Sequence, residues 1–347
     1  MTGTEYKENL TKKAYDVGTF YSNDANSTYM QSGLTKYWQL ENTLSYVKTI
    51  AQKHSINAVI GQTSYKNSYS WFSAGKRGMP DDIWSMSAGT KDASASSTST
   101  ESTMISYLGR LIYSYDNRYI FTGTMRRDGS SRFSDSSRWG NFPSLSFAWN
   151  AGNETFFKTF NTPISELKVR SSWGKLGNQE LDDYMYLASI TSAISYGVGQ
   201  PNTLWVGNIQ TELVPENLKW ETTTTSNIGL DLGLWNNKLR YSLDVFKKTT
   251  TDLLLQIPIP LSVGVGSYPW GNAGKVRNNG YEMMLNYNGH QGDFKYSVTG
   301  TLSHAGCQAR KALLVGKSGG DGVIFGIVVQ LKFNFGAVGR RSILIFY

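Results

Sequence analysis

The sequence has little of several features, and each shortage excludes a class of protein. Its 347 residues include a single cysteine, Cys307, so an internal disulfide cannot form. No apolar run approaches the roughly 20 residues of a membrane-spanning helix, which excludes insertion by α-helices. The polar N-terminus, MTGTEYKENLTKK, lacks the apolar core of a secretory signal. The chain is therefore either cytoplasmic or a piece of something longer.

Charged residues are also few, at 17 % of the sequence, and they are unevenly placed. Residues 305–347 hold six basic residues and one acidic residue, a net charge of +5, which leaves residues 1–304 only +3 of the total of +8. The main body has no stripe of lysine and arginine and no recognisable nucleic-acid-binding module. The composition therefore argues against nucleic acid as a partner.

Aromatic residues and glycine, in contrast, are abundant, with 21 tyrosines, 15 phenylalanines, 10 tryptophans and 35 glycines. Apolar residues recur at every second position, whereas helical spacing is nearly absent. In residues 220–234, for example, Ile228 and Leu230 alternate with Asn227 and Asp231. The alternation predicts ten β-strands, at residues 37–50, 56–66, 104–115, 118–128, 143–150, 166–174, 220–234, 238–252, 279–288 and 294–303.

The links between these strands alternate in length. Short links rich in Asn, Gly, Asp or Ser occupy residues 51–55, 116–117, 235–237 and 289–293. The long links are residues 67–103, 129–142, 175–219 and 253–278, and a link of middle length, 151–165, stands where a short one is due. Outer-membrane barrels have this asymmetry. The pattern predicts an all-β, antiparallel up-and-down transmembrane β-barrel with its long loops on one rim.

Aromatic residues gather near the strand ends. Tyr115 and Tyr119 flank one short link, and Trp235 lies in another. Amphipathic rings at both strand ends are typical of a barrel whose aromatics lie at the two headgroup levels. A soluble β-sandwich with these aromatics in its core remains the alternative. The aromatics toward the long-link ends are Trp38, Trp173, Trp220 and Tyr281.

Several long segments carry a family resemblance. YDNRYIFTGTMRRDGSSRFSDSSRWGNFPSLSFAWN is followed by LKVRSSWGKLGNQ, by LVPENLKWETTTTSNIGLDLGLWNNKLRYSLDVFKKTTTDLLLQIPIP, and by GNAGKVRNNGYEMMLNY. Upstream stand YWQLENTLSYVKTI and SYLGRLIYSYDNRY. In this order the segments resemble the barrel of the SusC/RagA family of TonB-dependent outer-membrane transporters, over roughly residues 1–304.

The resemblance implies a barrel of about 22 strands around an N-terminal plug. It also implies TonB-dependent import of oligosaccharides or peptides across the outer membrane, with a SusD-like surface lipoprotein as partner and the TonB complex contacting the plug. The chain shows no plug, so we expect a partial barrel of about 10–12 strands that is inactive alone. We take residues 1–304 as this domain. We take residues 305–347 as a divergent basic tail from a frame change or an assembly join, although residues 323–335 could still form a strand.

The sequence gives little support to catalysis. No metal-ligand spacing appears, and neither a cofactor nor a catalytic residue is predicted. The three histidines, His54, His290 and His304, are interpreted as solvated residues near turns. Asp81 and Asp82 are interpreted as part of a solvated loop.

Aromatic residues in the long links are the best candidates for contact with a substrate or partner, because sugars and peptides both pack on flat apolar faces. The resulting function is outer-membrane transport, not enzymatic. The alternative function is a soluble or surface-attached β-rich glycan-binding module. The contact candidates are Trp71, Phe72, Trp84, Tyr196, Trp205, Tyr268 and Trp270.

Overall fold

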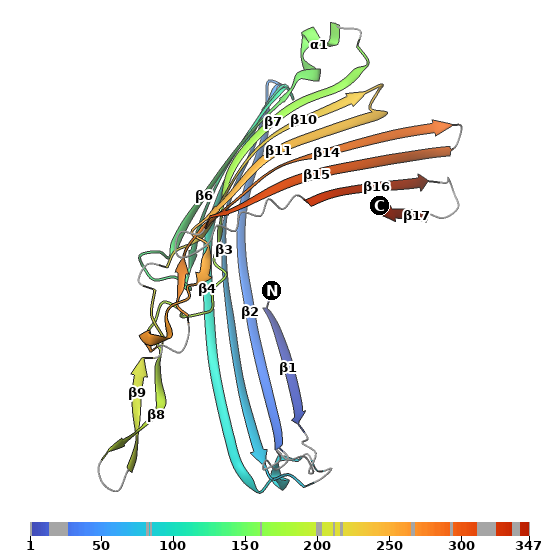
Figure 1. Cartoon of the computed structure of the whole chain (residues 1–347). Helices are drawn as coiled ribbons and strands as arrows, with labels where there is room; N and C mark the ends of the chain where they lie inside the picture. Colours follow the sequence, from blue (N-terminus) through green and yellow to red (C-terminus); the bar gives the residue numbers. More distant parts are fainter. Residues whose placement is uncertain are drawn as a thin grey trace.

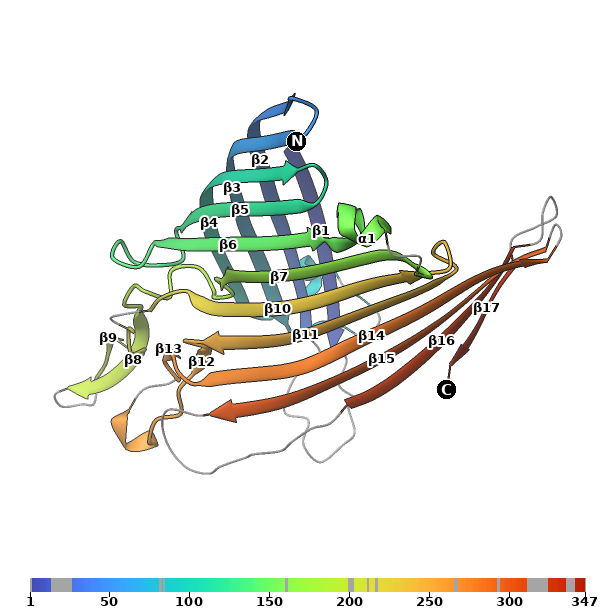
Figure 2. The ribbon, with the colours of Figure 1, turned by 90° about the horizontal axis from the view of Figure 1, so that it is seen from above.

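The computed structural model contains one large antiparallel sheet of thirteen strands, each paired with its neighbours in chain order (Figure 1). The order begins at β1 and ends at β17, so the sheet formed by the described strands is open and curls into a trough (Figure 2). The structure describes residues 2–13, 27–80, 83, 85–159, 162–198, 203–210, 212–215, 218–264, 268–291, 294–310, 324–334 and 341–346.

The thirteen strands include all ten that the alternation predicted, with β1, β16 and β17 in addition. In the first half of the chain the strands are β1 (Thr2–Lys13), β2 (Ser27–Ile50), β3 (His54–Arg77), β4 (Lys91–Tyr115), β5 (Tyr119–Ser130), β6 (Trp139–Asn150) and β7 (Ile164–Asn178). In the second half they are β10 (Glu221–Leu234), β11 (Leu239–Thr251), β14 (Lys275–Gln291), β15 (Phe294–Arg310), β16 (Ile324–Asn334) and β17 (Arg341–Phe346).

Smaller elements lie in the connections. Two hairpins form sheets of their own, β8 (Ile190–Val198) with β9 (Thr203–Gln210), and β12 (Leu254–Gln256) with β13 (Trp270–Asn272). The helical turns are η1 (Met86–Ala88), η2 (Ala151–Asn153), α1 (Thr155–Thr159) and η3 (Leu261–Val263). Across the described residues, no helix has the length and apolar character needed to span a membrane.

Short and long connections alternate along the sheet, as the sequence predicted. Tight turns join β4 to β5 and β10 to β11, and positive φ angles at Asp116, Asn117, Asn236 and Asn237 suit the side chains that tolerate the left-handed region. The links that hold η1, the β8–β9 hairpin and the β12–β13 hairpin all leave the opposite ends of their strands. In Figure 1 the short α1 link lies at the top and the β8–β9 hairpin at the bottom.

Each strand separates its side chains onto two faces. One cross-strand row joins Phe121, Phe147, Ser171, Ile228 and Val245, and we call this side the apolar face. The neighbouring row, which includes Arg170 and Asp244, belongs to the polar face. Large side chains of the apolar face are uncovered: Leu44 is 68 % exposed, Ile60 61 % and Ile228 65 %.

This exposure decides against the soluble β-sandwich alternative. A sandwich requires a second sheet that seals the apolar face, as its two inner faces interdigitate. Within the described part of the chain, the other two sheets are the short hairpins β8–β9 and β12–β13. The described strands therefore form an open, curved antiparallel wall with one uncovered apolar face, as the predicted partial barrel requires.

Several strands extend beyond the predicted limits. Trp71 and Phe72 were expected in a loop at residues 67–103, but both lie in β3, and β4 begins at Lys91. The prediction was wrong because the extensions carry short polar residues, such as the run 93–100, and show no apolar alternation. Backbone pairing holds them nonetheless, since Trp71 pairs with both Gly33 and Thr98.

The described strands also continue past residue 304. β15 runs to Arg310, and β16 pairs with it from Ile324 to Asn334. The domain boundary at 304 and the foreign origin of residues 305–347 stay predictions.

A buried aromatic cluster anchors the long connections, where the pairing of β6 with β7 stops at Ser144 and Gly174. Trp220 was expected among the aromatics at the strand ends, but it is only 7 % exposed, and its ring lies 4.9 Å from that of Phe133 and 5.4 Å from that of Phe142. A Cβ at Gly177 would lie 2.1 Å from the Phe142 ring, so glycine is required there. We call this the loop core: Phe133, Phe142, Leu181, Leu218, Trp220 and Leu254.

The short-link end is fastened around a buried carboxylate. Glu154, 6 % exposed, accepts hydrogen bonds from the Tyr119 hydroxyl at 2.6 Å and the Trp149 indole at 3.1 Å, and pairs with the Arg118 guanidinium at 2.9 Å. These hydrogen bonds lower the pKa of the Glu154 carboxyl below its ordinary value, and the bond from Tyr119 has the largest effect. Desolvation opposes this shift only in part. The start of the link after β6 is thereby held against the turn between β4 and β5.

Candidate functional site

An aromatic group lines the polar face of β2 and β3. The rings of Tyr37 and Tyr65 lie 6.0 Å apart, and a Cβ at Gly33 would lie 3.1 Å from the Tyr69 hydroxyl, so the Tyr69 ring covers that glycine. Trp71 pairs with Gly33 on the same face. We call Tyr37, Tyr65, Tyr69 and Trp71 the aromatic ladder.

The segment that follows β7 crosses this face. The Gln179 amide donates to the Tyr65 hydroxyl at 3.0 Å, although β4, β5 and β6 lie between β7 and β3 in the sheet. Arg132 pairs with Asp183 at 2.9 Å, and Leu181 packs in the loop core. Residues 179–183 therefore fold over the polar face and narrow its long-loop end.

A charged cluster lies farther along the polar face, on β7, β10 and β11. The Arg170 guanidinium binds Asp231 through two nitrogens, at 2.9 and 3.2 Å, and reaches Asp244 at 2.7 Å. Ser242 donates to Asp231 at 2.7 Å, and Asn227 donates to Asp244 at 3.0 Å. One cation is thus held between two carboxylates, and the group has a net charge of −1.

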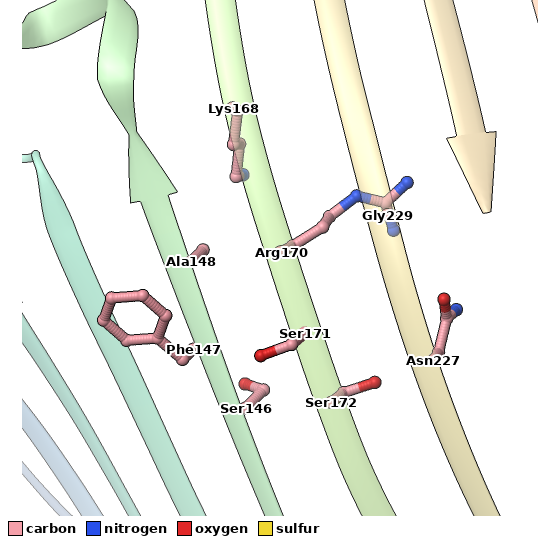
Figure 3. A pocket seen from close by; sticks show the side chains of 9 residues that line it. All are labelled: Ser146, Phe147, Ala148, Lys168, Arg170, Ser171, Ser172, Asn227 and Gly229. Atoms are coloured by element: carbon pink, nitrogen blue, oxygen red, sulfur yellow. The ribbon is translucent and has the colours of Figure 1, made fainter. Parts of the chain in front are cut away.

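The strand between these partners carries a glycine for a steric reason. Gly229 pairs with Arg170 on one side and Asp244 on the other, and a Cβ there would lie 2.8 Å from the guanidinium carbon. The bare backbone lets Arg170 lie across β10, as Figure 3 shows.

A shallow pocket of about 250 Å³ adjoins the Arg170 cluster between β6, β7 and β10 (Figure 3). Its polar lining offers hydroxyl, amide and ammonium groups, which donate and accept hydrogen bonds without a reactive pair among them. Such groups are suited to hydrogen bonding with a polar molecule. The lining residues with polar side chains on this face are Ser146, Lys168, Arg170, Ser172 and Asn227, and Ser171, whose side chain belongs to the apolar face, also borders the pocket.

Those of the seven predicted contact residues that the structure describes do not form one group, although Tyr196 in β8 pairs with Trp205 in β9. Trp71 lies on the polar face, whereas Phe72, 60 % exposed, lies on the apolar face. Trp205 in β9 is 57 % exposed, and Tyr268 before β13 is 47 % exposed. Trp270 packs against the loop core. Trp84 and the side chain of Tyr196 lie outside the described residues, as do Asp81 and Asp82.

The interpretation of the histidines as solvated turn residues was wrong for two of them. His54 begins β3, and its Nδ1 lies 2.8 Å from the Tyr113 hydroxyl. His304 lies within β15, with its ring 5.3 Å from that of Tyr281. The side chain of His290 lies outside the described residues. Among the side chains that the structure does describe, no three of His, Cys, Asp and Glu are grouped to hold a metal ion.

The tyrosines of the aromatic ladder and the Arg170 cluster were not predicted, because contact residues were expected only in the long links. Both sets lie within strands. The available signal was parity: Tyr65, Tyr69 and Trp71 share odd numbers in β3, so they share one face. Which strands then bring Arg170 to Asp231 depends on the long-range pairing of β7 with β10, which no local pattern encodes.

Comparison with known families gives one match over almost the whole chain. The family model described as TonB dependent receptor-like, beta-barrel, matches residues 2–337. Among curated proteins, TonB-dependent receptor SusC of Bacteroides thetaiotaomicron is 41 % identical over 188 residues, which are 54 % of this chain and 19 % of SusC. TonB-dependent receptor P26 of Formosa agariphila is 32 % identical over 290 residues, 81 % of this chain and 28 % of that protein. The chain thus matches between about a fifth and somewhat more than a quarter of the length of these relatives.

Solved structures share the fold at low sequence identity. The RagAB peptide importer in its open-open state superposes with a TM-score of 0.74 at 20 % identity, over 100 % of this chain and 39 % of that one. A second structure, of the RagAB peptide transporter, gives a TM-score of 0.73 at 22 % identity, over 83 % of this chain and 32 % of that one. The open sheet thus corresponds to part of a larger barrel wall.

Proposed function

Because this chain belongs to the TonB-dependent receptor-like β-barrel family, whose members cross the outer membrane with strands, we propose that it forms part of the wall of a nutrient importer. In the complete barrel the polar face lines the interior and the apolar face contacts lipid. The observation that carries the proposal is the family match over residues 2–337, together with the separation of polar and apolar faces in the same strands. The role is transport, with no chemical step assigned to this wall.

The imported substrate is an oligosaccharide or a peptide. SusC is the relative with the highest identity given above, and the superposed RagAB structures are of a peptide importer. On this chain, the exposed aromatics of the polar face and the long connections suit either substrate, because sugar rings and peptide side chains both pack on flat apolar surfaces. We assign substrate contact to Trp71, Trp205 and Tyr268, and contact with a partner or lipid to Phe72.

The proposed partners follow from the same family. A SusD-like surface lipoprotein would cover the long-loop rim, where Trp205 and Tyr268 are exposed. Energy would come from the TonB complex through a plug domain outside this chain. The open edges β1 and β17 support the need for further strands, since unpaired backbone groups are costly in lipid.

A matched pair of adjacent aromatics tests the proposal in the complete transporter. Uptake of labelled neutral oligosaccharides and of labelled peptides is measured in cells with and without TonB. We expect saturable, TonB-dependent uptake of one of these classes. Trp71→Ala should weaken substrate affinity roughly three- to tenfold through loss of ring contact, whereas Phe72→Ala should leave it unchanged. TonB-independent uptake, or no uptake of either class, would contradict the proposed function.

A further inference from the structure

Carboxylates are distributed very unevenly between the two faces of the sheet. Among the residues of β2 to β15 that pair in regular register, the apolar face carries one described carboxylate, Glu101, which pairs with Lys66 at 2.7 Å. The other carboxylates of these paired residues lie on the polar face, where cations also occur. They are Glu41, Asp128, Glu166, Glu221, Asp231, Asp244 and Glu282.

Most described cations of the apolar face lie toward the long-loop rim, although Lys48 lies beside the short link between β2 and β3. Arg127 lies eight residues beyond Tyr119, where β5 begins, and Lys247 lies eight residues beyond Leu239, where β11 begins. Trp173 and Lys247 share one cross-strand row through Ser226, and Lys175 lies in the next row toward the rim. These three cations are exposed, and no described carboxylate lies within salt-bridge distance of Arg127, Lys175 or Lys247.

Aromatic rings accompany these cations. The Arg127 guanidinium lies 4.9 Å from the centre of the Trp139 ring, and that ring stacks on Tyr107 at 6.2 Å. Trp139 is 40 % exposed and Trp173 42 % exposed. Amphipathic rings of this kind mark the depth where acyl chains meet headgroups, and long basic side chains extend from there into the headgroup layer.

We infer that Arg127, Lys175 and Lys247 form a basic belt that binds the phosphate groups of a phosphorylated glycolipid in the outer leaflet. Guanidinium and ammonium groups both bind phosphate oxygens, and the belt lacks carboxylates that would compete. The three cations lie on three different strands, β5, β7 and β11, which fits contact with a lipid array better than capture of one free phosphate. The inference rests on the proposed position of the long-loop rim at the cell surface.

The test compares two lipids and two matched variants of the complete transporter in detergent. Binding of diphosphorylated lipid A, and of the same lipid without its phosphates, is measured by native mass spectrometry. Arg127→Gln with Lys247→Gln removes two charges from the apolar face. The control, Arg240→Gln with Lys248→Gln, removes two charges from the polar face, and Lys247 and Lys248 are neighbours on β11.

We expect the wild type to prefer the phosphorylated lipid, and the apolar-face variant to lose about fivefold in affinity for each cation removed. The control should stay within about twofold of the wild type, and inorganic phosphate should not compete with the lipid. Equal binding of the two lipids by the wild type would overturn the inference even if a variant failed to fold. Competition by inorganic phosphate would also overturn it, because it would indicate a site for the free ion. Substrate uptake is a separate readout, so its failure would count against the transport proposal alone.

Discussion

Arg170 is the residue on which two carboxylates of the polar face depend. Its side chain is 34 % exposed, and those of Asp231 and Asp244 are 28 % and 22 % exposed, so water screens the group only partly. Removing the cation leaves two like charges on neighbouring strands with only neutral hydrogen-bond donors. The cluster therefore stabilises the pairing of β7, β10 and β11.

We predict that Arg170→Gln lowers the free energy of unfolding by about 1–2 kcal/mol, between the values for exposed and fully buried ion pairs. The measurement is the urea midpoint of the complete transporter in detergent. Arg240→Gln serves as the control, because Arg240 is an exposed cation of the same face with no described ion-pair partner. Equal midpoints for the two variants would show that the cluster contributes no stability.

Glu154 should make the stability of the short-link end of the sheet depend on pH. Its pKa is lowered in the folded protein, so the stability that it contributes is present above the unfolded value of 4.5 and is lost as the pH falls through the folded pKa. We predict that acidification below 4.5 loosens residues 151–159, seen as a fall in their amide protection factors, that is, in protection relative to the intrinsic exchange rate at each pH. In Glu154→Gln these protection factors should already be lower at neutral pH and should change little as the pH falls. A variant as pH-dependent as the wild type would refute the assignment.

At the scale of elements, the strands within the membrane could be predicted and their extensions could not. Lipid imposes apolar alternation on β10 and β11, and this is the signal that the sequence analysis used. Strand ends that lie outside the lipid need no apolar alternation, so the polar ends of β3 and β4 were predicted as loops. The hairpins β8–β9 and β12–β13 were missed for the same reason. In the candidate site, the contact role predicted for Trp71 stays a prediction, and its neighbours on β2 depend on strand pairing, which the sequence does not show.

The loop core makes an element-scale prediction. Trp220→Ala removes a buried ring between Phe133 and Phe142, and we expect a loss of about 3–5 kcal/mol, as for other large aromatic truncations. Because this core anchors the long connections, protease cleavage between β7 and β10 should accelerate. Trp220→Phe keeps one aromatic ring but removes part of the buried indole and its hydrogen bond to the Arg138 carbonyl, so the loss should be smaller, about 1–2 kcal/mol. Equal cleavage rates in wild type and Trp220→Ala would contradict an anchoring role.

At the scale of the whole molecule, the two faces of one curved sheet face different solvents. The apolar face exposes Leu44, Ile60 and Ile228, and the polar face carries the Arg170 cluster, the aromatic ladder and the inward-folded segment 179–183. Ten strands were foreseen and thirteen are paired, yet the direction of every described long link was predicted correctly. In an up-and-down antiparallel sheet, successive links lie at opposite ends of the strands. Links that alternate between short and long therefore place all long links at one rim.

The most direct test of this central claim uses two adjacent serines of β7. Ser171 lies in the apolar row between Phe147 and Ile228, and Ser172 lies on the polar face beside Asn227. In the complete transporter with Cys307→Ser, single variants Ser171→Cys and Ser172→Cys are labelled with a fluorophore, and membranes are treated with a lipid-soluble quencher. The two positions differ by one residue and carry the same side chain. The account predicts strong quenching at position 171 and little at position 172; equal quenching at both, or none at 171, would contradict it.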